Sequence, residues 1–273
     1  MKISIGKIIS LWFGAALLCV AELAAAQAAT VFELSGSASA TPSGGTARIL
    51  RKGDGINQGE TVTTGAASSV VIRFEDGQVA ALSANSRLVI STYVYNRTDA
   101  TKSNVLISLL QGGMRAVTGL IGKSRPQQVA YRAANATIGI RGTDTNISVE
   151  GNIVAVSVSD GQVSFSFGGE TVILSAGQAV ITTPSGATQR VPASGLAAAL
   201  RAQGTTAGTT LAAAITSLNS PVIAAAVNSA SQPGTPTPTP APTPTPITQP
   251  GTTPTTTTTG GSGGAGGGTA SPK

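Results

Sequence analysis

The feature that most constrains the fold is a series of short apolar segments separated by glycine-containing turns. The segments are rich in Val, Ile and Thr, the residue types that strands prefer. The clearest are residues 69–74, 78–82, 87–95, 104–110, 136–140, 145–149, 153–158, 162–167, 171–174 and 178–182. Short strands at this spacing are typical of sandwiches, barrels and solenoids. We therefore predict an all-β domain over residues 29–192, either solenoid-like or sandwich-like.

Asp-Gly dipeptides mark two of the predicted turns. Asp76-Gly77 and Asp160-Gly161 each follow an apolar segment, and each is followed by Gln-Val. Asp-Gly between such segments favours a hairpin, because both central turn residues need a positive φ. We expect a hairpin at both places, a break in the chain at Gly112-Gly113 and another turn at Gly177. The repeated four residues indicate an internal repeat or a reused turn, and we favour the turn.

The N-terminus has the layout of a secretory signal peptide. Lys2 and Lys7 precede an uninterrupted apolar run at residues 8–20, and small residues follow up to Ala28. This order predicts cleavage after Ala28 and export of the chain. The alternative is an uncleaved anchor, for which the apolar run is short compared with the ~20 residues of a membrane span. We expect the protein in the periplasm, or secreted to the cell surface.

Two segments of different composition follow the predicted β-domain. Residues 193–230 are rich in Ala and Thr, and Ala favours helix. We expect one or two short helices there that pack on the domain or fray. Residues 231–273 contain Pro-Thr repeats and a Gly-rich end. This composition predicts a disordered tail with an extended, polyproline-type spacer.

The residue types leave little for catalysis to use. The chain has no histidine, which excludes Ser-His-Asp and Cys-His catalysis and His-bound metals. Its one cysteine, Cys19, lies in the leader, so the exported chain would have neither a disulfide nor a Cys-bound metal. Glu75 and Asp76 are adjacent and would point to opposite faces of a strand. We predict no enzymatic activity, no cofactor and no metal.

Charge and aromatic residues say little about partners. The formal net charge is +6, but the charges are scattered, whereas nucleic-acid binding needs a dense basic face. We therefore expect no nucleic-acid partner, and no stable membrane span after cleavage. Tyr93 and Tyr95 are two residues apart and share one face of a predicted strand. Packing in the core is the favoured interpretation of this pair, and contact with a partner is the alternative.

An ordered series of motifs resembles the FecR domain, a family of periplasmic β-domains. The series runs from KGDGINQGETVTTG through VIRFEDGQVAALSANSRLVI, LLQGGMRAVTG and TIGIRGT to LSAGQAVI, and covers about residues 46–182. The resemblance implies a solenoid-like β-fold outside the cytoplasm. The residues that match its structural motif are Asp76, Gly77, Gly139, Arg141, Gly142, Thr143, Asp160, Gly161 and Gly177.

The chain departs from the family pattern in two places. Ala133-Ala134 stand where the family often has Thr-Pro, and Thr145-Asn146 where an aromatic residue often follows the RGT. Family members in iron uptake relay a signal from an outer-membrane transporter to a sigma factor through a cytoplasmic segment. Seven residues precede the apolar run, so we expect no anti-sigma segment and do not transfer the iron-signalling role.

The IRG part of the motif has a structural interpretation. Gly139 and Gly142 permit close approach or unusual φ values. Arg141 lies between them, and a buried arginine needs a partner. We expect Arg141 to bind turn carbonyls, or a carboxylate such as Asp144 or Asp160. Contact with an anion or a protein partner is the alternative.

Three functional hypotheses remain. The first is a non-enzymatic envelope protein whose FecR-like domain binds or scaffolds a protein partner or envelope polymer, with a possible part in signalling. The second is an exported surface or matrix protein with its tail as a spacer. The third, a polysaccharide-active enzyme on a β-scaffold, is disfavoured because histidine is absent and carboxylates are few. The sequence leaves the oligomeric state open.

Overall fold

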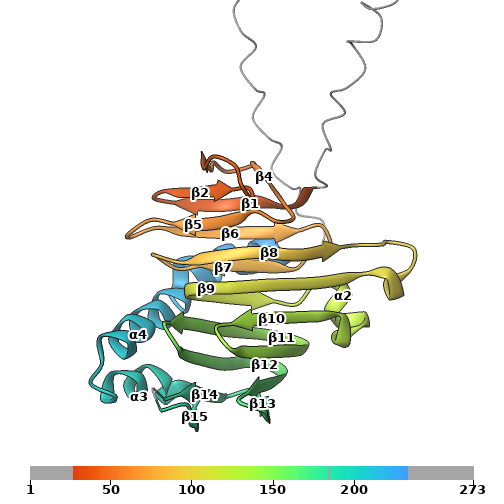
Figure 1. Ribbon diagram of the computed structural model, residues 1–273. Helices are drawn as coiled ribbons and strands as arrows, with labels where there is room; N and C mark the ends of the chain where they lie inside the picture. Colours follow the sequence, from red (N-terminus) through yellow and green to blue (C-terminus); the bar gives the residue numbers. More distant parts are fainter. Residues whose placement is uncertain (1–26, 184, 233–273) are drawn as a thin grey trace, which may run out of the picture. The chain divides into compact units, whose positions relative to one another are not determined.

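The computed structural model describes residues 27–183 and 185–232, which form strands followed by short helices (Figure 1). The strands are β1 (Gln27–Ser35), β2 (Ala38–Thr41), β3 (Arg48–Ile49), β4 (Gly55–Asn57), β5 (Thr61–Thr64), β6 (Ser69–Phe74), β7 (Val79–Leu82), β8 (Arg87–Val94), β9 (Asn104–Val117), β10 (Val129–Ala133), β11 (Ala136–Glu150), β12 (Ile153–Phe167), β13 (Glu170–Ser175), β14 (Gln178–Thr182) and β15 (Thr188–Pro192). The helices are η1 (Ala100–Lys102), α2 (Leu120–Ser124), η2 (Pro126–Gln128), η3 (Ala193–Gly195), α3 (Leu196–Ala202), α4 (Thr206–Leu218) and α5 (Pro221–Ser231). The strand-rich fold class is as predicted.

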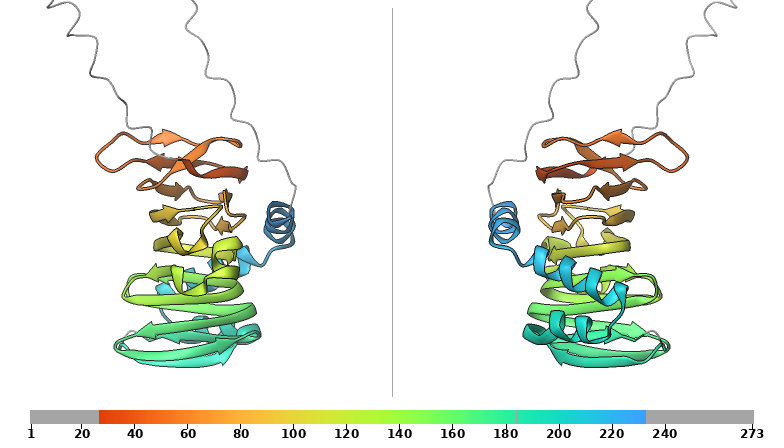
Figure 2. Two further views of the ribbon diagram at one scale, coloured as in Figure 1. Left: turned by 90° about the vertical axis from the view of Figure 1, so that its right-hand side faces the viewer. Right: turned by 90° about the vertical axis from the view of Figure 1, so that its left-hand side faces the viewer.

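The strands belong to one 15-stranded sheet that folds over into two faces. Face A runs β3, β2, β5, β8, the first half of β9, β10, the first half of β11, the second half of β12, and β13. Face B runs β4, β1, β6, β7, the second half of β9, the second half of β11, the first half of β12, β14 and β15. Neighbouring strands are antiparallel, except β9 and β10, which are parallel. The sheet is therefore mixed, and its rungs stack along one axis (Figure 2).

Three long strands cross from one face to the other. β9 pairs with β8 and β10 up to Gln111, and with β7 and β11 from Gly112 onward. Gly112 has a φ of +83°, and the Gly113 amide donates to the Ser86 hydroxyl at 2.9 Å. The predicted chain break at Gly112-Gly113 is therefore wrong: the glycines bend a continuous strand, as glycines do at sharp bends in sheets.

The two Asp-Gly dipeptides have different roles. Asp76-Gly77 is the predicted hairpin turn between β6 and β7, closed by a hydrogen bond from the Gly77 amide to the Phe74 carbonyl. The hairpin predicted at Asp160-Gly161 is wrong, because these residues lie inside β12 where it bends between the faces. The long-range pairing of β12 with β11 keeps the strand continuous through a dipeptide that would otherwise favour a turn.

Both dipeptides nevertheless lie on the same side of the stack, which we call the glycine edge. It consists of Gly77, Gly119, Gly142, Gly161 and Gly177. Hydrogen bonds link successive rungs here, from the Leu120 amide to the Asp76 carbonyl, and from Thr118 to Thr143. The repeated motif thus marks two rungs of one edge.

The main core lies between the two faces. Its largest fully buried side chains include Tyr131, Phe74 and Phe165. Strands of face A alternate buried and exposed residues, as in β10 and β13. In face B, β7 and residues 153–158 of β12 are buried throughout. A continuous buried run means that both sides of the strand are covered.

Helices α3, α4 and α5 supply that second cover, on the outer side of face B (Figure 2). Leu200, Leu211 and Ile215 pack on Ile153 and Ile181 in one cluster. Ile223 and Val227 of α5 pack on β6 and β7 in another. Thr205 and Ser220 cap α4 and α5 with their side-chain oxygens, which satisfies amides at each helix start. The helices therefore pack on the domain rather than fray.

A membrane-spanning helix has to meet two requirements, sufficient length and sufficient apolarity. Within residues 27–183 and 185–232 no single helix meets both. Helices α4 and α5, bent by 55° at their junction, meet them as a pair.

Candidate docking face

The outer side of face A is the broad sheet surface that none of α3, α4 and α5 covers. Outward positions alternate with core positions along β8, β10 and β11. They carry Arg87, Arg132 and Arg141, all exposed, and between them small residues such as Ser108, Ser164 and Ser166. None of the outward residues of β8–β13 in this face is acidic. The surface is rich in hydroxyl groups and cationic.

Arg141 reaches this surface and does not enter the core. The expectation that it is buried against a carboxylate is wrong: Arg141 is exposed. Arg115 occupies the predicted role instead, and its Nε and Nη2 donate to the two oxygens of Asp144 at 2.9 and 2.6 Å. The reason is the bend at Gly142, which has a φ of +59°. Arg141 precedes the bend on face A, whereas Asp144 follows it on face B.

The other glycines of the motif permit close approach, as expected. A Cβ on Gly139 would lie 2.5 Å from the Ser164 hydroxyl oxygen on the neighbouring strand. A Cβ on Gly161 would overlap the Gly142 carbonyl oxygen. Thr143 is buried, and its amide donates to the Thr118 hydroxyl at 2.8 Å. Asp160 is exposed, and Gly177 has open space around it at a φ of +81°.

A hollow of about 640 Å³, which we call the Gly139 hollow, indents face A near the glycine edge. Its floor includes Ala130, Gly139 and Ser164, and its rim includes Arg141 and Gln162. Pro126 and Gln127 of η2 form one wall, and Ile173 of β13, which is 51% exposed, forms another. The hollow exists because Gly139 lacks a side chain and Ala130 and Ser164 have small ones.

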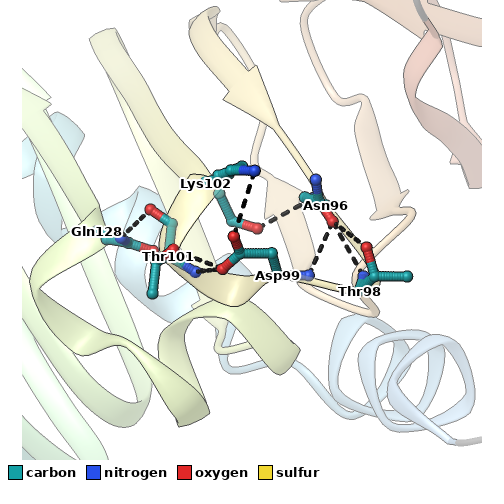
Figure 3. A network of polar contacts seen from close by, with 7 residues as sticks. Asn96, Thr98, Asp99, Thr101, Lys102 and Gln128 are labelled. Carbon is teal, nitrogen blue, oxygen red and sulfur yellow. Dashed lines mark hydrogen bonds and ion pairs between the residues drawn. The ribbon is translucent and has the colours of Figure 1, made fainter.

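The wall of the hollow is held by a hydrogen-bonded loop between β8 and β9 (Figure 3). The Asn96 side-chain oxygen accepts from the amides of Thr98 and Asp99. Hydrogen bonds from Thr101 lower the pKa of the exposed Asp99 carboxyl. The Gln128 side-chain amide donates to the Thr101 carbonyl at 2.9 Å and so fixes η2 to this loop. The loop therefore fixes one side of the hollow.

Tyr93 and Tyr95 both lie toward the core side of β8, as the spacing predicts. Tyr93 is 8% exposed and its ring lies 5.2 Å from that of Phe74, centroid to centroid. Its hydroxyl accepts from the Asp76 amide at 2.9 Å and donates to the Asp76 carboxylate at 3.2 Å. Tyr95 is partly buried against the core, with the Arg97 guanidinium 5.9 Å from its ring centre. The structure thus places Tyr93 in the core and Tyr95 at its margin.

Asp76 is a buried acid in the first rung of the glycine edge. It is 1% exposed, and its carboxylate accepts from the Gln78 amide at 3.1 Å and the Ile121 amide at 3.3 Å. Burial raises the pKa of Asp76 above its usual 3.8, although the hydrogen bonds from Gln78, Ile121 and Tyr93 oppose the rise. Burial also raises the pKa of Tyr93. Asp76 thus links the β6–β7 turn to β8 and α2 through hydrogen bonds. Burial disfavours the charged form of its carboxyl group.

We expect the stability of the domain to depend on pH through Asp76. A carboxyl with a raised pKa in the folded state binds its proton more tightly there than in the unfolded chain. Its contribution to stability is fully present below pH 3.8 and is lost as pH rises through the folded-state pKa. As pH rises from acid to neutral, the free energy of unfolding of the parent protein, measured in urea, should therefore fall relative to that of the Asp76→Asn variant. A difference that stays constant, or grows with pH, would contradict this assignment.

The Arg115–Asp144 pair was not identified from the sequence. Its side chains are 13% and 20% exposed, and hydrogen bonding to Asp144 raises the pKa of Arg115. Nearby, the Asn146 amide donates to the Asn219 side-chain oxygen at 3.1 Å. These polar contacts lie between the two apolar clusters under the helices. No local sequence pattern indicates this ion pair, because Arg115 and Asp144 are 29 residues apart.

Arg115→Ala should lower the free energy of unfolding by about 2 kcal/mol, because it leaves the half-buried Asp144 carboxylate unpaired. Lys52→Ala is the matched control, since its ion pair with Glu33 is 58% and 48% exposed. Exposed pairs contribute at most about 1 kcal/mol. Urea denaturation of both variants measures the contrast, and equal losses would show that the Arg115 pair stabilises no more than a surface pair.

In residues 27–183 and 185–232, no three His, Cys, Asp or Glu side chains come close enough together to hold a metal ion. The surface chemistry on face A is that of guanidinium, amide and hydroxyl groups over an apolar floor. Groups of these kinds bind a ligand through hydrogen bonds, charge pairing and van der Waals contact.

Part of the chain is similar to proteins of known structure. Two crystal structures described as a "putative anti-sigma factor" from Parabacteroides distasonis ATCC 8503 are similar at 17% identity and a TM-score of 0.41, over 53% of this chain. The chain spans 65% and 64% of the length of those two chains. No curated protein matches the chain.

The family comparison agrees with the motif series. The family model described as FecR protein matches residues 60–164, a narrower range than the sequence motifs indicated. The match includes Arg87, Arg132, Gly139 and Arg141 of face A, and it ends before β13 and helices α3, α4 and α5. FecR domains occur in regulatory proteins associated with the cell envelope. Residues 60–164 of this chain are a FecR domain.

Proposed function

We propose that the chain is an exported, non-enzymatic envelope protein whose FecR domain binds a protein partner in a signalling relay, through the outer side of face A. One observation carries the proposal. The helices cover face B, whereas face A presents a broad, cationic surface within the matched domain. Exposed sheet surfaces and edges are recurrent sites of protein recognition.

A role in binding rather than catalysis is supported by how the carboxylates are placed. Asp76 is buried, and amides and the Tyr93 hydroxyl occupy its oxygens. Glu75 and Asp160 are exposed, and Asp144 is paired with Arg115. General acid–base catalysis needs such groups positioned together around a substrate. Activity assays on envelope polysaccharides with the Asp160→Asn variant test this part of the proposal.

Export is proposed from the leader sequence, which lies outside the described residues. Strand β1 begins at Gln27, and its Ala28 and Ala29 are each 1% exposed. A cut after Ala28 would remove two residues from this strand, whereas a cut after Ala26 would leave it whole. We therefore expect N-terminal sequencing of the protein from cells to begin at Gln27. A mature chain that begins at Ala29 would restore the boundary predicted from the sequence.

The signalling role is tested by gene expression. A chromosomal Arg141→Glu variant should reproduce the expression changes of a deletion strain, because it reverses the charge of the proposed contact. Arg201→Glu, an exposed charge on α3, should leave expression as in the parent. Equal effects of the two variants, at equal protein levels, would contradict docking through face A.

The second candidate is an exported structural protein of the cell surface, favoured by the Pro- and Thr-rich composition of residues 233–258. It predicts no regulated genes in the deletion strain. It also predicts that a chain ending at Gln232 is lost from the surface fraction. The two experiments together separate the candidates.

A further inference from the structure

The Gly139 hollow is part of a trough that crosses five strands of face A, β9 to β13. Hydrogen-bonded strand partners place one small or apolar residue on each strand in a single row. The row is Leu106, Ala130, Gly139, Ser164 and Ile173. The middle three positions are the smallest, so the row is lowest at its centre. Leu106 and Ile173 close its two ends with apolar side chains.

Longer polar side chains stand on both sides of this row. Arg132, paired with Thr137, lies two residues to one side of the Ala130–Gly139 pair. Arg141, paired with Gln162, lies two residues to the other side of Gly139. Four residues of a strand span about 13 Å. Two guanidinium groups, on flexible stems, therefore face each other across a floor that holds no charge.

The charges near the trough are predominantly positive. A second hollow of about 410 Å³ adjoins Arg132 and is lined by Asn135 and Asn152. Lys123 and Arg125 are exposed on the segment that leads into η2. Asp99, on the neighbouring loop, is already paired with Lys102 at 3.5 Å. The exposed Asp160, at the glycine edge, is the main opposing charge near Arg141.

Three observations narrow the occupant. No aromatic side chain lines either hollow, whereas aromatic faces are what sugar rings stack on. Residues 233–273 contain no Asp or Glu, so the tail of the chain does not complement the arginines. The floor is neutral and narrow, and an extended polypeptide fits it with its carboxylates directed to the two sides. Opposite charges across an interface provide both steering and register.

We propose that the trough binds an extended acidic segment of a protein partner, with carboxylates paired to Arg132 and Arg141 and the segment's backbone over Ala130, Gly139 and Ser164. Successive side chains of an extended segment point to opposite sides. Acidic residues one or three apart therefore direct their carboxylates to the two sides of the trough, where Arg132 and Arg141 lie. This inference rests on the proposed function and specifies its chemistry: Arg141, exposed on the motif that the sequence singles out, is a contact residue.

The test measures binding of a fluorescein-labelled (Glu-Glu-Thr)₄ peptide to the full-length protein by fluorescence anisotropy at about 0.15 M salt, where the Debye length is about 8 Å. Arg132→Glu and Arg141→Glu should each weaken binding by about tenfold or more, the effect of losing a close charge pair and adding repulsion. Ala130→Leu, which fills the floor without changing charge, should also weaken it by about tenfold, because the segment can no longer reach the floor. Arg201→Glu should change it by less than about twofold, since exposed charges beyond a Debye length are screened.

Two further ligands distinguish peptide recognition from simple charge. The (Gln-Gln-Thr)₄ peptide should bind at least about tenfold more weakly than (Glu-Glu-Thr)₄, because it lacks carboxylates for the two guanidinium groups. Polygalacturonate, an anionic polysaccharide, should compete poorly. If polygalacturonate binds as well as (Glu-Glu-Thr)₄ and loses binding in the same variants, the trough takes an anionic polymer and the proposal is overturned.

The remaining outcomes are also decisive. No binding of (Glu-Glu-Thr)₄, or equal binding to Ala130→Leu and to the parent, overturns the trough as an acidic-segment site. Circular dichroism and urea denaturation of each variant show whether it is folded. Either failure leaves the proposed function standing if Arg141→Glu still alters gene expression, because that experiment does not depend on the acidity of the partner.

Discussion

Gly161→Ala is expected to lower the free energy of unfolding by more than about 4 kcal/mol, enough to unfold many domains of ordinary stability. Gly161 has a φ of +76°, and an L-residue held in that region costs about 1–3 kcal/mol. Its Cβ would also overlap the carbonyl group of Gly142 on the neighbouring strand. That neighbour is backbone at the bend of β11, so it cannot move without disturbing both long strands.

Gly177→Ala separates these two costs. Gly177 lies on the same glycine edge with a φ of +81°, and its Cβ would have open space. We expect a loss of about 1–2 kcal/mol from the backbone conformation alone. Urea denaturation of both variants gives the comparison. Equal losses would mean that the contact between the bends of β11 and β12 does not limit stability.

Leu211→Asp is expected to release the helices from face B. Leu211 is fully buried between α3 and the strands around Ile153 and Ile181. Removing a buried leucine costs about 2–5 kcal/mol, and a carboxylate there would have no partner to offset its desolvation. The variant should therefore bind a dye specific for exposed apolar surface. Backbone amides of α3 and α4 should exchange with solvent far faster than in the parent.

Thr209→Asp is the control for this substitution. Thr209 is exposed on the first turn of α4, where a negative charge is favourable near the helix N-terminus. Its exchange rates should match those of the parent. If Leu211→Asp leaves α3 and α4 protected as well, the helices do not depend on this cluster, and the covering of face B needs another explanation.

The local strand pattern predicted the fold class because each strand depends on short-range alternation. Residues 69–74 and 178–182 were placed correctly for this reason. The bends at Gly112 and Gly161 were not predicted. A glycine that ends a strand and one that bends it look alike in sequence, and the choice depends on pairing with distant strands. A long strand that bends from one face to the other has no local sequence pattern that distinguishes it from two separate strands.

The site could be predicted in part. The motif around Gly139 and Arg141 was singled out, but the side to which Arg141 points was not. The strand register shifts between Arg141 and Asp144. The alternation of core-facing and outward side chains changes there, so a count that starts on one side of the bend gives the wrong direction for side chains on the other side. Arg115 was missed because its partner lies 29 residues away. The trough itself depends on cross-strand partners, and these become visible only in the folded sheet.

Docking through face A is tested most directly by photo-crosslinking in living cells from single positions on each side of the domain. A photoreactive residue at Thr137, exposed between Arg132 and Arg141, should give a discrete cross-linked protein. That product should be lost when Arg141→Glu is added. The same photoreactive residue at Thr209 on α4 should give none. A product from Thr209 that survives Arg141→Glu, with none from Thr137, would place the partner on the helices and contradict the account.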